Sequence, residues 1–280
     1  MLYELNDLVE GYVVKRPSKY IKTPYVADVL LLNNEVLAHT ASLGCCGLVD
    51  HGASVLLGKM PIPKNKNTNQ KCEYRVYLSI YKDELNETIV GVHPKLAEDL
   101  VENALQLNFL SKLKSVKTYK RETPVYIEGK VDSRFDFSGI DNNDIPFIME
   151  VKNVPLADYE DVTSIEKKKL DFSSREWNSK VAYFPDGYRK KKTDPVSPRA
   201  LKHLRELMII KKETNTRCIM CYVIQRNDVN RFTASIIDEE YRNTLKKSME
   251  ENIEIITLVV EWSRSGIATF ICDDLPIVFD

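Results

Sequence analysis

Hydrophobic and polar residues alternate with the two-residue period of β-strands along the first third of the chain. Two such runs, at 26–32 and 36–40, flank Asn33-Asn34, which predicts an antiparallel hairpin with its turn at the two asparagines. Similar runs predict three further strands, at 11–14, 54–57 and 74–81. Five short strands in this order are typical of a small closed barrel such as an OB-fold, a frequent binder of single-stranded nucleic acid.

From about residue 92 the pattern becomes a mixture of helix and strand periods. An apolar stripe with i, i+4 spacing predicts a helix at 95–109, and Ser197-Pro198 forms the cap and first turn of a second helix. The other predicted elements are strands near 124–128, 134–139, 146–152, 218–225 and 254–260 and a helix from Asp238 to Glu250. We therefore predict an α+β protein, with an OB-like β-barrel over 1–85 and an α/β domain with a central mixed sheet over 86–280.

Charge and hydropathy narrow the class of protein. Lys and Arg number 40 and Asp and Glu 41, so affinity for nucleic acid must come from local patches such as Lys167–Lys169 and Arg189–Lys192. A charge run is equally typical of a solvated loop. No apolar run approaches the ~20 residues that span a membrane, and the start of the sequence is acidic. We expect an intracellular, cytoplasmic protein, with the nucleus as an alternative and no membrane partner.

The cysteines do not predict a metal site. Cys218 and Cys221 have the spacing of a zinc knuckle, but they fall within a strand-like run and should face opposite sides of a sheet. Cys45 and Cys46 are adjacent, which suits neither structural zinc nor an ordinary disulfide. All six cysteines are interpreted as reduced thiols.

The strongest candidate for chemistry is Glu150-Val151-Lys152, with Asp136 upstream. Side chains alternate along a strand, so Glu150 and Lys152 should face one side and Val151 the core. Two carboxylates can hold Mg²⁺, which neutralises a phosphate and activates water, and Lys152 could orient that water. Glu102, near the edge of the stripe on the 95–109 helix, could add a third acid. The plain alternative is a surface strand that ends in Glu and Lys.

Five short motifs occur in a fixed order: SRFDF at 133–137, EVKNV at 150–154, YFPD at 183–186, KHLREL at 202–207 and QRND at 225–228. On these motifs the chain resembles the sugar fermentation stimulation protein family. The resemblance implies an OB-type N-terminal domain followed by a restriction-endonuclease-like, PD-(D/E)XK nuclease domain. It places Asp136, Glu150 and Lys152 at the nuclease-motif positions, with Glu102 on the preceding helix.

The resemblance implies a nuclease that uses Mg²⁺ (or Mn²⁺). Asp136 and Glu150 would hold the metal, Lys152 would orient the attacking water and Glu102 would be an auxiliary catalytic residue. DNA is the expected partner, with RNA as an alternative and a homodimer left open. The residues expected to contact nucleic acid are Arg16, Lys19, Arg134, Arg199, Lys202, His203 and Arg226. Two other functions are considered: a non-catalytic DNA-binding transcriptional regulator of sugar metabolism that retains the nuclease scaffold, and a protein-binding module.

Overall fold

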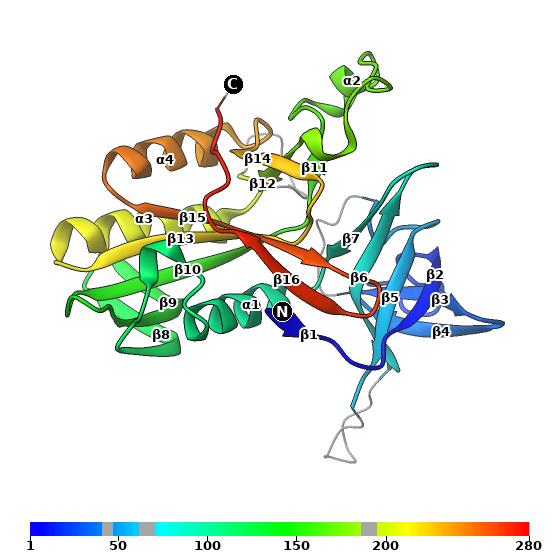
Figure 1. Cartoon of the computed structure of the whole chain (residues 1–280), viewed down its shortest axis with the longest axis horizontal. Helices are drawn as coiled ribbons and strands as arrows, with labels where there is room; N and C mark the ends of the chain where they lie inside the picture. Colours follow the sequence, from blue (N-terminus) through cyan, green and yellow to red (C-terminus); the bar gives the residue numbers. More distant parts are fainter. Residues whose placement is uncertain (41–46, 62–70, 186–194, 280) are drawn as a thin grey trace.

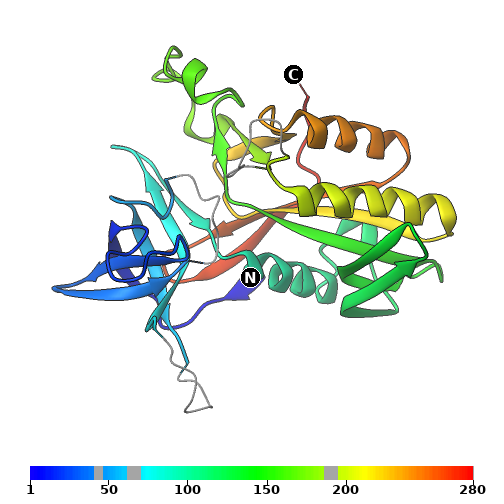
Figure 2. The same ribbon diagram turned by 180° about the vertical axis from the view of Figure 1, so that it is seen from behind.

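The computed structural model describes residues 1–40, 47–61, 71–185 and 195–279. Two regions lie side by side in Figure 1: a group of N-terminal strands, and a sheet with helices on both of its faces. The view from behind in Figure 2 shows the same arrangement. No helix in these described ranges is both long and apolar enough to cross a membrane. The basic run Arg189–Lys192 and the pair Cys45-Cys46 lie outside the described residues.

The N-terminal region contains the strands that the alternating pattern predicts. They are β2 (Val9–Lys15), β3 (Val26–Leu31), β4 (Asn34–His39), β5 (Ser54–Lys59) and β6 (Tyr74–Lys82). Their hydrogen-bonded order is β4-β3-β2-β5-β6, and a short parallel pairing also joins β4 to β6. The β3–β4 turn is Leu32-Asn33, one residue earlier than predicted, because Leu31 pairs with Asn34 and Leu32 adopts a positive φ of 53°. Asn34 is the first residue of β4.

The second region is built on a mixed sheet. Its strands follow the order β7 (Glu87–Gly91), β15 (Glu254–Trp262), β13 (Arg217–Ile224), β10 (Pro146–Val154), β9 (Val131–Ile140) and β8 (Thr118–Ile127). The three central strands β15, β13 and β10 are parallel, and the flanking pairs are antiparallel. Parallel strands are usually buried on both faces, and all residues of β13 after Arg217 are buried. The predicted α+β class with a central mixed sheet is confirmed.

Three helices cover this sheet. α1 (Pro94–Gln106) packs its predicted stripe against one face, and α3 (Pro198–Glu213) and α4 (Glu239–Glu250) cover the other face (Figure 1). The predicted stripe residues of α1 are all buried: Leu96, Leu100, Val101, Ala104 and Leu105. Cys221 belongs to the core under α1 and Cys218 to the core under α3 and α4. The prediction that these two thiols face opposite sides is therefore confirmed.

Several short elements were not predicted. β11 (Ala157–Asp158), β12 (Lys180–Phe184) and β14 (Val229–Ala234) form a separate three-stranded sheet, and β1 (Tyr3–Glu4) pairs with β16 (Ile267–Cys272). The segment 155–180 also contains α2 (Ser164–Lys167) and a 3-10 turn at Trp177–Ser179. β7, which follows the predicted boundary at 85/86, pairs with both β6 and β15. Hydrogen bonding thus continues through that boundary, and the division into two domains stays a prediction.

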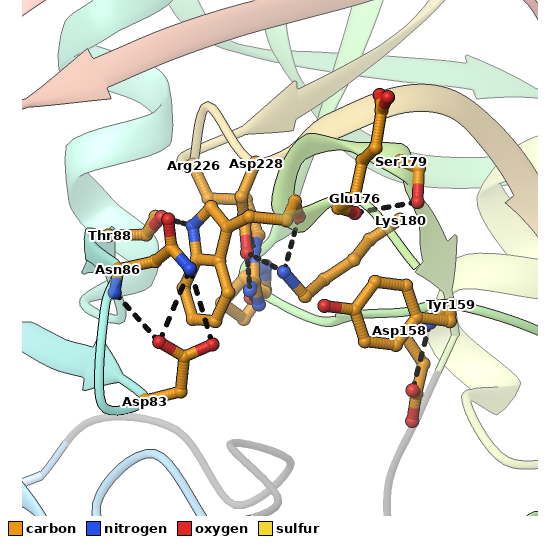
Figure 3. A network of polar contacts seen from close by, with 12 residues as sticks. Asp83, Asn86, Thr88, Asp158, Tyr159, Glu176, Ser179, Lys180, Arg226 and Asp228 are labelled. Atoms are coloured by element: carbon orange, nitrogen blue, oxygen red, sulfur yellow. Dashed lines mark hydrogen bonds and ion pairs between the residues drawn. The ribbon is translucent and has the colours of Figure 1, made fainter. Parts of the chain in front are cut away.

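A buried group of charges joins the 155–180 segment to the strands β6 and β7 (Figure 3). Lys180 Nζ lies 3.0 Å from Asp228 Oδ2, and Arg226 Nε lies 2.6 Å from Asp228 Oδ1. We call these three residues the Lys180–Asp228 cluster. The Lys180 ammonium also lies 3.6 Å from the centre of the Trp177 ring, whose Nε1 donates to Thr88 Oγ1 at 2.9 Å. The Tyr81 ring on β6 stacks on Trp177 and lies 5.1 Å from the Arg226 guanidinium, so these contacts fix the segment before β12 against β6 and β7.

Candidate functional site

A cleft of about 340 Å³ opens where the first turns of α1, the end of β10 and the start of α3 meet. Its charged lining residues are Glu98, Asp136, Glu150, Lys152 and Arg199. Its other lining residues are Pro94, Ala97, Val151, Asn153, Pro155, Leu156, Tyr183, Phe184, Ser197 and Ala200. The structure thus brings Asp136, Glu150 and Lys152 together, as the strand pattern predicts.

The strand period of β10 sets the orientation of these side chains. Glu150 and Lys152 lie on one side of β10, where Lys152 donates to Glu150, while the side chain of Val151 packs in the core under α1 and also borders the cleft. β9 supplies Asp136, whose Oδ2 accepts a hydrogen bond from the Val151 backbone N–H at 2.7 Å. A backbone bond on the neighbouring strand therefore fixes the aspartate relative to Glu150.

Glu150 is the most enclosed acid of the cleft, with 3% of its surface exposed. Its Oε1 accepts hydrogen bonds from Lys152 Nζ and His203 Nδ1. Burial tends to raise the pKa of this carboxyl, but Lys152 and His203 outweigh burial, and the pKa lies below its ordinary value. The second oxygen, Oε2, is buried and finds no hydrogen-bond partner among the described residues. We refer to it as the open oxygen.

Asp136 has the opposite shift. Burial, followed by the charge of Glu150, raises the pKa of Asp136 to about 7, and Glu98 adds to the effect. Lys152 and the Val151 N–H oppose the rise. Two adjacent carboxylates that are shielded from solvent resist simultaneous ionisation. Near neutral pH, Glu150 is therefore charged and Asp136 is half protonated. A pair of this kind is suited to a cation, which relieves the repulsion.

The acid that α1 contributes to the cleft is Glu98 rather than the predicted Glu102. Glu102 lies one turn further along α1, where its Oε2 accepts from Arg121 Nη1 at 2.8 Å and its Oε1 from the Tyr119 hydroxyl at 3.3 Å. Glu98 also pairs with Arg121, at 2.7 Å. The helical period predicts which face of α1 carries the acid. Which helical turn on that face reaches the cleft depends on where β10 ends.

Of the residues predicted to contact nucleic acid, Arg199 lines the cleft and is exposed. Arg16 is mostly enclosed, and its Nε donates to the Pro24 carbonyl at 2.8 Å. Lys19 pairs with Glu35 at 2.6 Å and Arg134 with Glu122 at 3.1 Å; both cations remain partly exposed. Lys202 is exposed too, and its Nζ donates to the Asp132 carbonyl at 2.7 Å. These four residues do not line the cleft.

Two of the predicted contacts are corrected. Arg226 is 2% exposed and bound to Asp228 within the Lys180–Asp228 cluster, so it stabilises the fold and presents no charge to a ligand (Figure 3). His203 is buried behind Glu150 and holds its Oε1. A signal for its burial was present in the sequence, because His203 precedes Leu207 by one helical turn on the apolar side of α3.

The donor set fits a hard divalent cation. In the described ranges no group of three or more His, Cys, Asp or Glu side chains forms a complete metal-ligand set. Mg²⁺ does not need one, because it commonly binds one or two carboxylates together with waters and substrate phosphate. Asp136 and the open oxygen of Glu150 provide such oxygens, whereas zinc would require more nitrogen or sulfur ligands.

Fold and site together define an α+β protein in which a small N-terminal β-region adjoins a mixed sheet with an acidic cleft. The family model described as "Sugar fermentation stimulation protein RE domain" matches residues 95–266, more than half of the chain. The chain therefore belongs to the sugar fermentation stimulation protein family, as the five motifs indicate.

Two relatives and one solved structure illustrate this membership. The sugar fermentation stimulation protein homolog of Maricaulis maris is 29% identical over 94% of this chain and 93% of its own. The homolog of Bartonella henselae is 30% identical over 72% of both chains. The solved structure of Pyrococcus furiosus SfsA in complex with Ca²⁺ matches with a TM-score of 0.73 and 18% identity, over 99% of each chain. At that identity, the structural match shows a shared fold.

Proposed function

We propose that this chain is a DNA-binding protein whose cleft hydrolyses phosphodiester bonds with Mg²⁺ or Mn²⁺; RNA is the alternative substrate. The observation that carries the proposal is the open oxygen of Glu150 beside an Asp136 whose pKa is raised. A buried acceptor that lacks a donor destabilises a protein by about 1–3 kcal/mol, and a bound cation removes this penalty. The similar protein from Pyrococcus furiosus was solved with Ca²⁺, another divalent ion that prefers oxygen ligands, which supports a divalent cation here.

Four residues of the cleft, and His203 behind it, have a role in this proposal. His203 holds Oε1 of Glu150, which leaves the open oxygen as a ligand, and Asp136 supplies the second carboxylate. Lys152, held by Glu150, is placed to orient a water or a phosphate oxygen. A bound divalent ion would neutralise phosphate charge and lower the pKa of a bound water. Arg199, exposed at the rim, would pair with a backbone phosphate.

The surface of the N-terminal β-region supports nucleic-acid binding. Tyr12, Tyr20 and Tyr25 are exposed there, and the Lys19 ammonium lies 4.9 Å from the centre of the Tyr20 ring. Exposed aromatic rings beside cations are the features on which single-stranded bases stack. The same features also favour a second candidate, a DNA-binding regulator without cleavage.

A cleavage assay on single- and double-stranded DNA and RNA, with Mg²⁺, Mn²⁺ or EDTA, tests the proposal. We expect metal-dependent cleavage by the wild type and a loss of at least about 100-fold, or ~2.7 kcal/mol of transition-state stabilisation, for Asp136→Asn, Glu150→Gln and Lys152→Ala. Glu240→Gln, which removes an exposed carboxylate that pairs with Arg205, is the matched control.

Wild-type activity in Asp136→Asn or Glu150→Gln would show that the site is assigned wrongly. Tight DNA binding without cleavage under any metal condition would favour the regulator. Cleavage that persists in EDTA would contradict the role of the cation.

A further inference from the structure

Three buried nitrogen atoms outside the cleft share an unusual property. His39 Nδ1, Arg75 Nε and His93 Nδ1 have no hydrogen-bond partner in the described part of the chain. Most buried polar groups in proteins are paired, so such an atom calls for a physical explanation. We call the three residues the His39–Arg75–His93 cluster and their atoms the open nitrogens.

Strand register and a ring contact bring the three residues near one another. His39 on β4 pairs directly with Arg75 on β6, so their side chains share a face of the sheet. Tyr77 lies two residues further along β6 on that same face, and its ring centre is 5.3 Å from that of His93. His39 and Arg75 are partly exposed, whereas His93 is 8% exposed. The cluster therefore runs from the protein surface inward to His93.

His93 is also the N-cap residue of α1. Its side chain makes no capping hydrogen bond, and Pro94 occupies the first helical position. The N-terminus of a helix carries partial positive charge and backbone N–H groups that favour an anion. In α1, a helix of 13 residues, this partial positive charge adds to the positive charge of the Arg75 guanidinium.

The chemistry of the cluster selects an anion over a cation. Burial, followed by the charge of Arg75 and of His39, lowers the pKa of His93 to about 4. Burial, followed by the charge of Arg75, likewise lowers the pKa of His39. A metal ion at the open nitrogens would lie beside a fixed guanidinium charge, whereas an oxyanion could accept from all three groups.

We propose that the His39–Arg75–His93 cluster binds a phosphate oxyanion, and that in the working protein this is a backbone phosphate of nucleic acid leading into the cleft. Pro94, Ala97 and Glu98 on the first turns of α1 line the cleft, so the cluster lies at the end of α1 nearest to it. The identity of the ligand as nucleic acid rests on the proposed function; the phosphate site itself does not.

The protein contains four histidines, so ¹⁵N-imidazole NMR can follow each one. In EDTA, the full chain is titrated with inorganic phosphate, and with chloride at the same ionic strength. We expect saturable shifts of His39 and His93 with phosphate alone. The signals of His51 and His203 should not shift, because His51 Nδ1 is already bonded to the Val14 carbonyl and His203 to Glu150.

Arg75→Gln should weaken phosphate binding about tenfold, since it removes a charge-assisted hydrogen bond, and Arg75→Lys should retain part of the affinity. Arg205→Gln is the matched control, because Arg205 is exposed and paired with Glu240. A short oligothymidylate in EDTA forms the second arm of the experiment. Its affinity should fall in Arg75→Gln and stay unchanged in Arg205→Gln.

Equal shifts of all four histidines, or wild-type phosphate affinity in a folded Arg75→Gln, would overturn the site. Phosphate binding with no effect of Arg75→Gln on oligonucleotide affinity would overturn nucleic acid as the source. Because both arms run without metal or cleavage, an inactive protein that still binds phosphate here would refute the proposed function and leave this site standing.

Discussion

The Lys180–Asp228 cluster and the Glu150 site are both groups of charges enclosed by the fold, but they differ in how their atoms are paired. In the Lys180–Asp228 cluster both Asp228 oxygens accept from Arg226, at 2.6 and 2.7 Å, and Arg226 Nη1 also donates to the Pro155 carbonyl. Burial opposes the charge of Asp228, yet Arg226 and Lys180 hold its pKa below the ordinary value. All three members are thus hydrogen-bonded, and the two cations share the carboxylate of Asp228.

At the Glu150 site the pairing is incomplete. The open oxygen of Glu150 lacks a partner among the described residues, and Asp136 stays half protonated near neutral pH. Such strain persists in proteins mainly where a ligand relieves it. The comparison separates two uses of buried charge: the complete cluster holds segments together, and the incomplete one is the site at which we propose a bound cation.

The largest effect should come from breaking the complete cluster. Asp228→Asn leaves Lys180 and Arg226 buried beside a neutral amide, so we expect the free energy of unfolding to fall by about 3–5 kcal/mol. Urea denaturation measures this change. Asp144→Asn, at an exposed ion pair with Lys117, should change stability by less than about 1 kcal/mol. A small effect of Asp228→Asn would remove the distinction between the two clusters.

Asp136→Asn should raise the free energy of unfolding, whereas Asp228→Asn should lower it. The pKa of Asp136 is raised from 3.8 to about 7 on folding, so the wild type loses stability as pH rises between these values. The amide does not titrate and can still accept from Val151. In EDTA its stability advantage should grow from near zero at pH 4 to about 2–4 kcal/mol at pH 8. Denaturation curves that stay parallel across this range would contradict the raised pKa.

His203 offers a test of positioning. His203→Ala frees Oε1 of Glu150, and we expect a 10–100-fold loss, about 1.4–2.7 kcal/mol, with a higher Mg²⁺ concentration needed for half-maximal cleavage. His203→Asn should restore part of this loss, because its amide can replace the Nδ1 donor. Lower activity with an unchanged metal requirement would show that His203 matters only for packing.

The smallest effect should come from the rim of the cleft. Arg199→Gln should weaken nucleic-acid binding by about 1 kcal/mol, a few-fold, and reduce the slope of affinity against salt by about one. Binding is measured in EDTA over a range of salt concentrations. Arg134→Gln, at an exposed residue away from the cleft, is the comparison. An equal change in both variants would place the nucleic acid along β8 and β9 instead.

The sequence predicted the central part of the site because one strand determines it. Glu150 and Lys152 are two residues apart on β10, and the strand period alone brings them to one side. The turn of α1 that supplies an acid depends on a distant helix–strand packing, and the burial of Arg226 depends on Lys180 and Asp228. Such non-local contacts leave no periodic signal.

In the fold, too, the elements that depend on non-local contacts could not be predicted from the hydrophobic pattern. The long strands and the three main helices follow from hydrophobic period, and most of their predicted ends lie within a few residues of the observed ones. β14 and β16 carry exposed and half-buried residues, so their pattern is weak. β1 has two residues, and it is stabilised by non-local contacts, its pairing with β16 and the packing of Tyr3 against Trp262.

The position of β15 also determines the order in which the nascent chain can fold. β15 pairs with β7, β13 and β16, and among the described strands β1 pairs with β16 alone. Strands more than 160 residues upstream therefore complete their pairing only after the β15–β16 segment has been made. During synthesis the N-terminal strands can pair early, while β7 keeps one unpaired edge until residues 254–272 emerge from the ribosome. Until then this edge of β7, like the edge of β13 that β15 covers, can pair with another chain, and a chaperone that covers it would prevent such pairing.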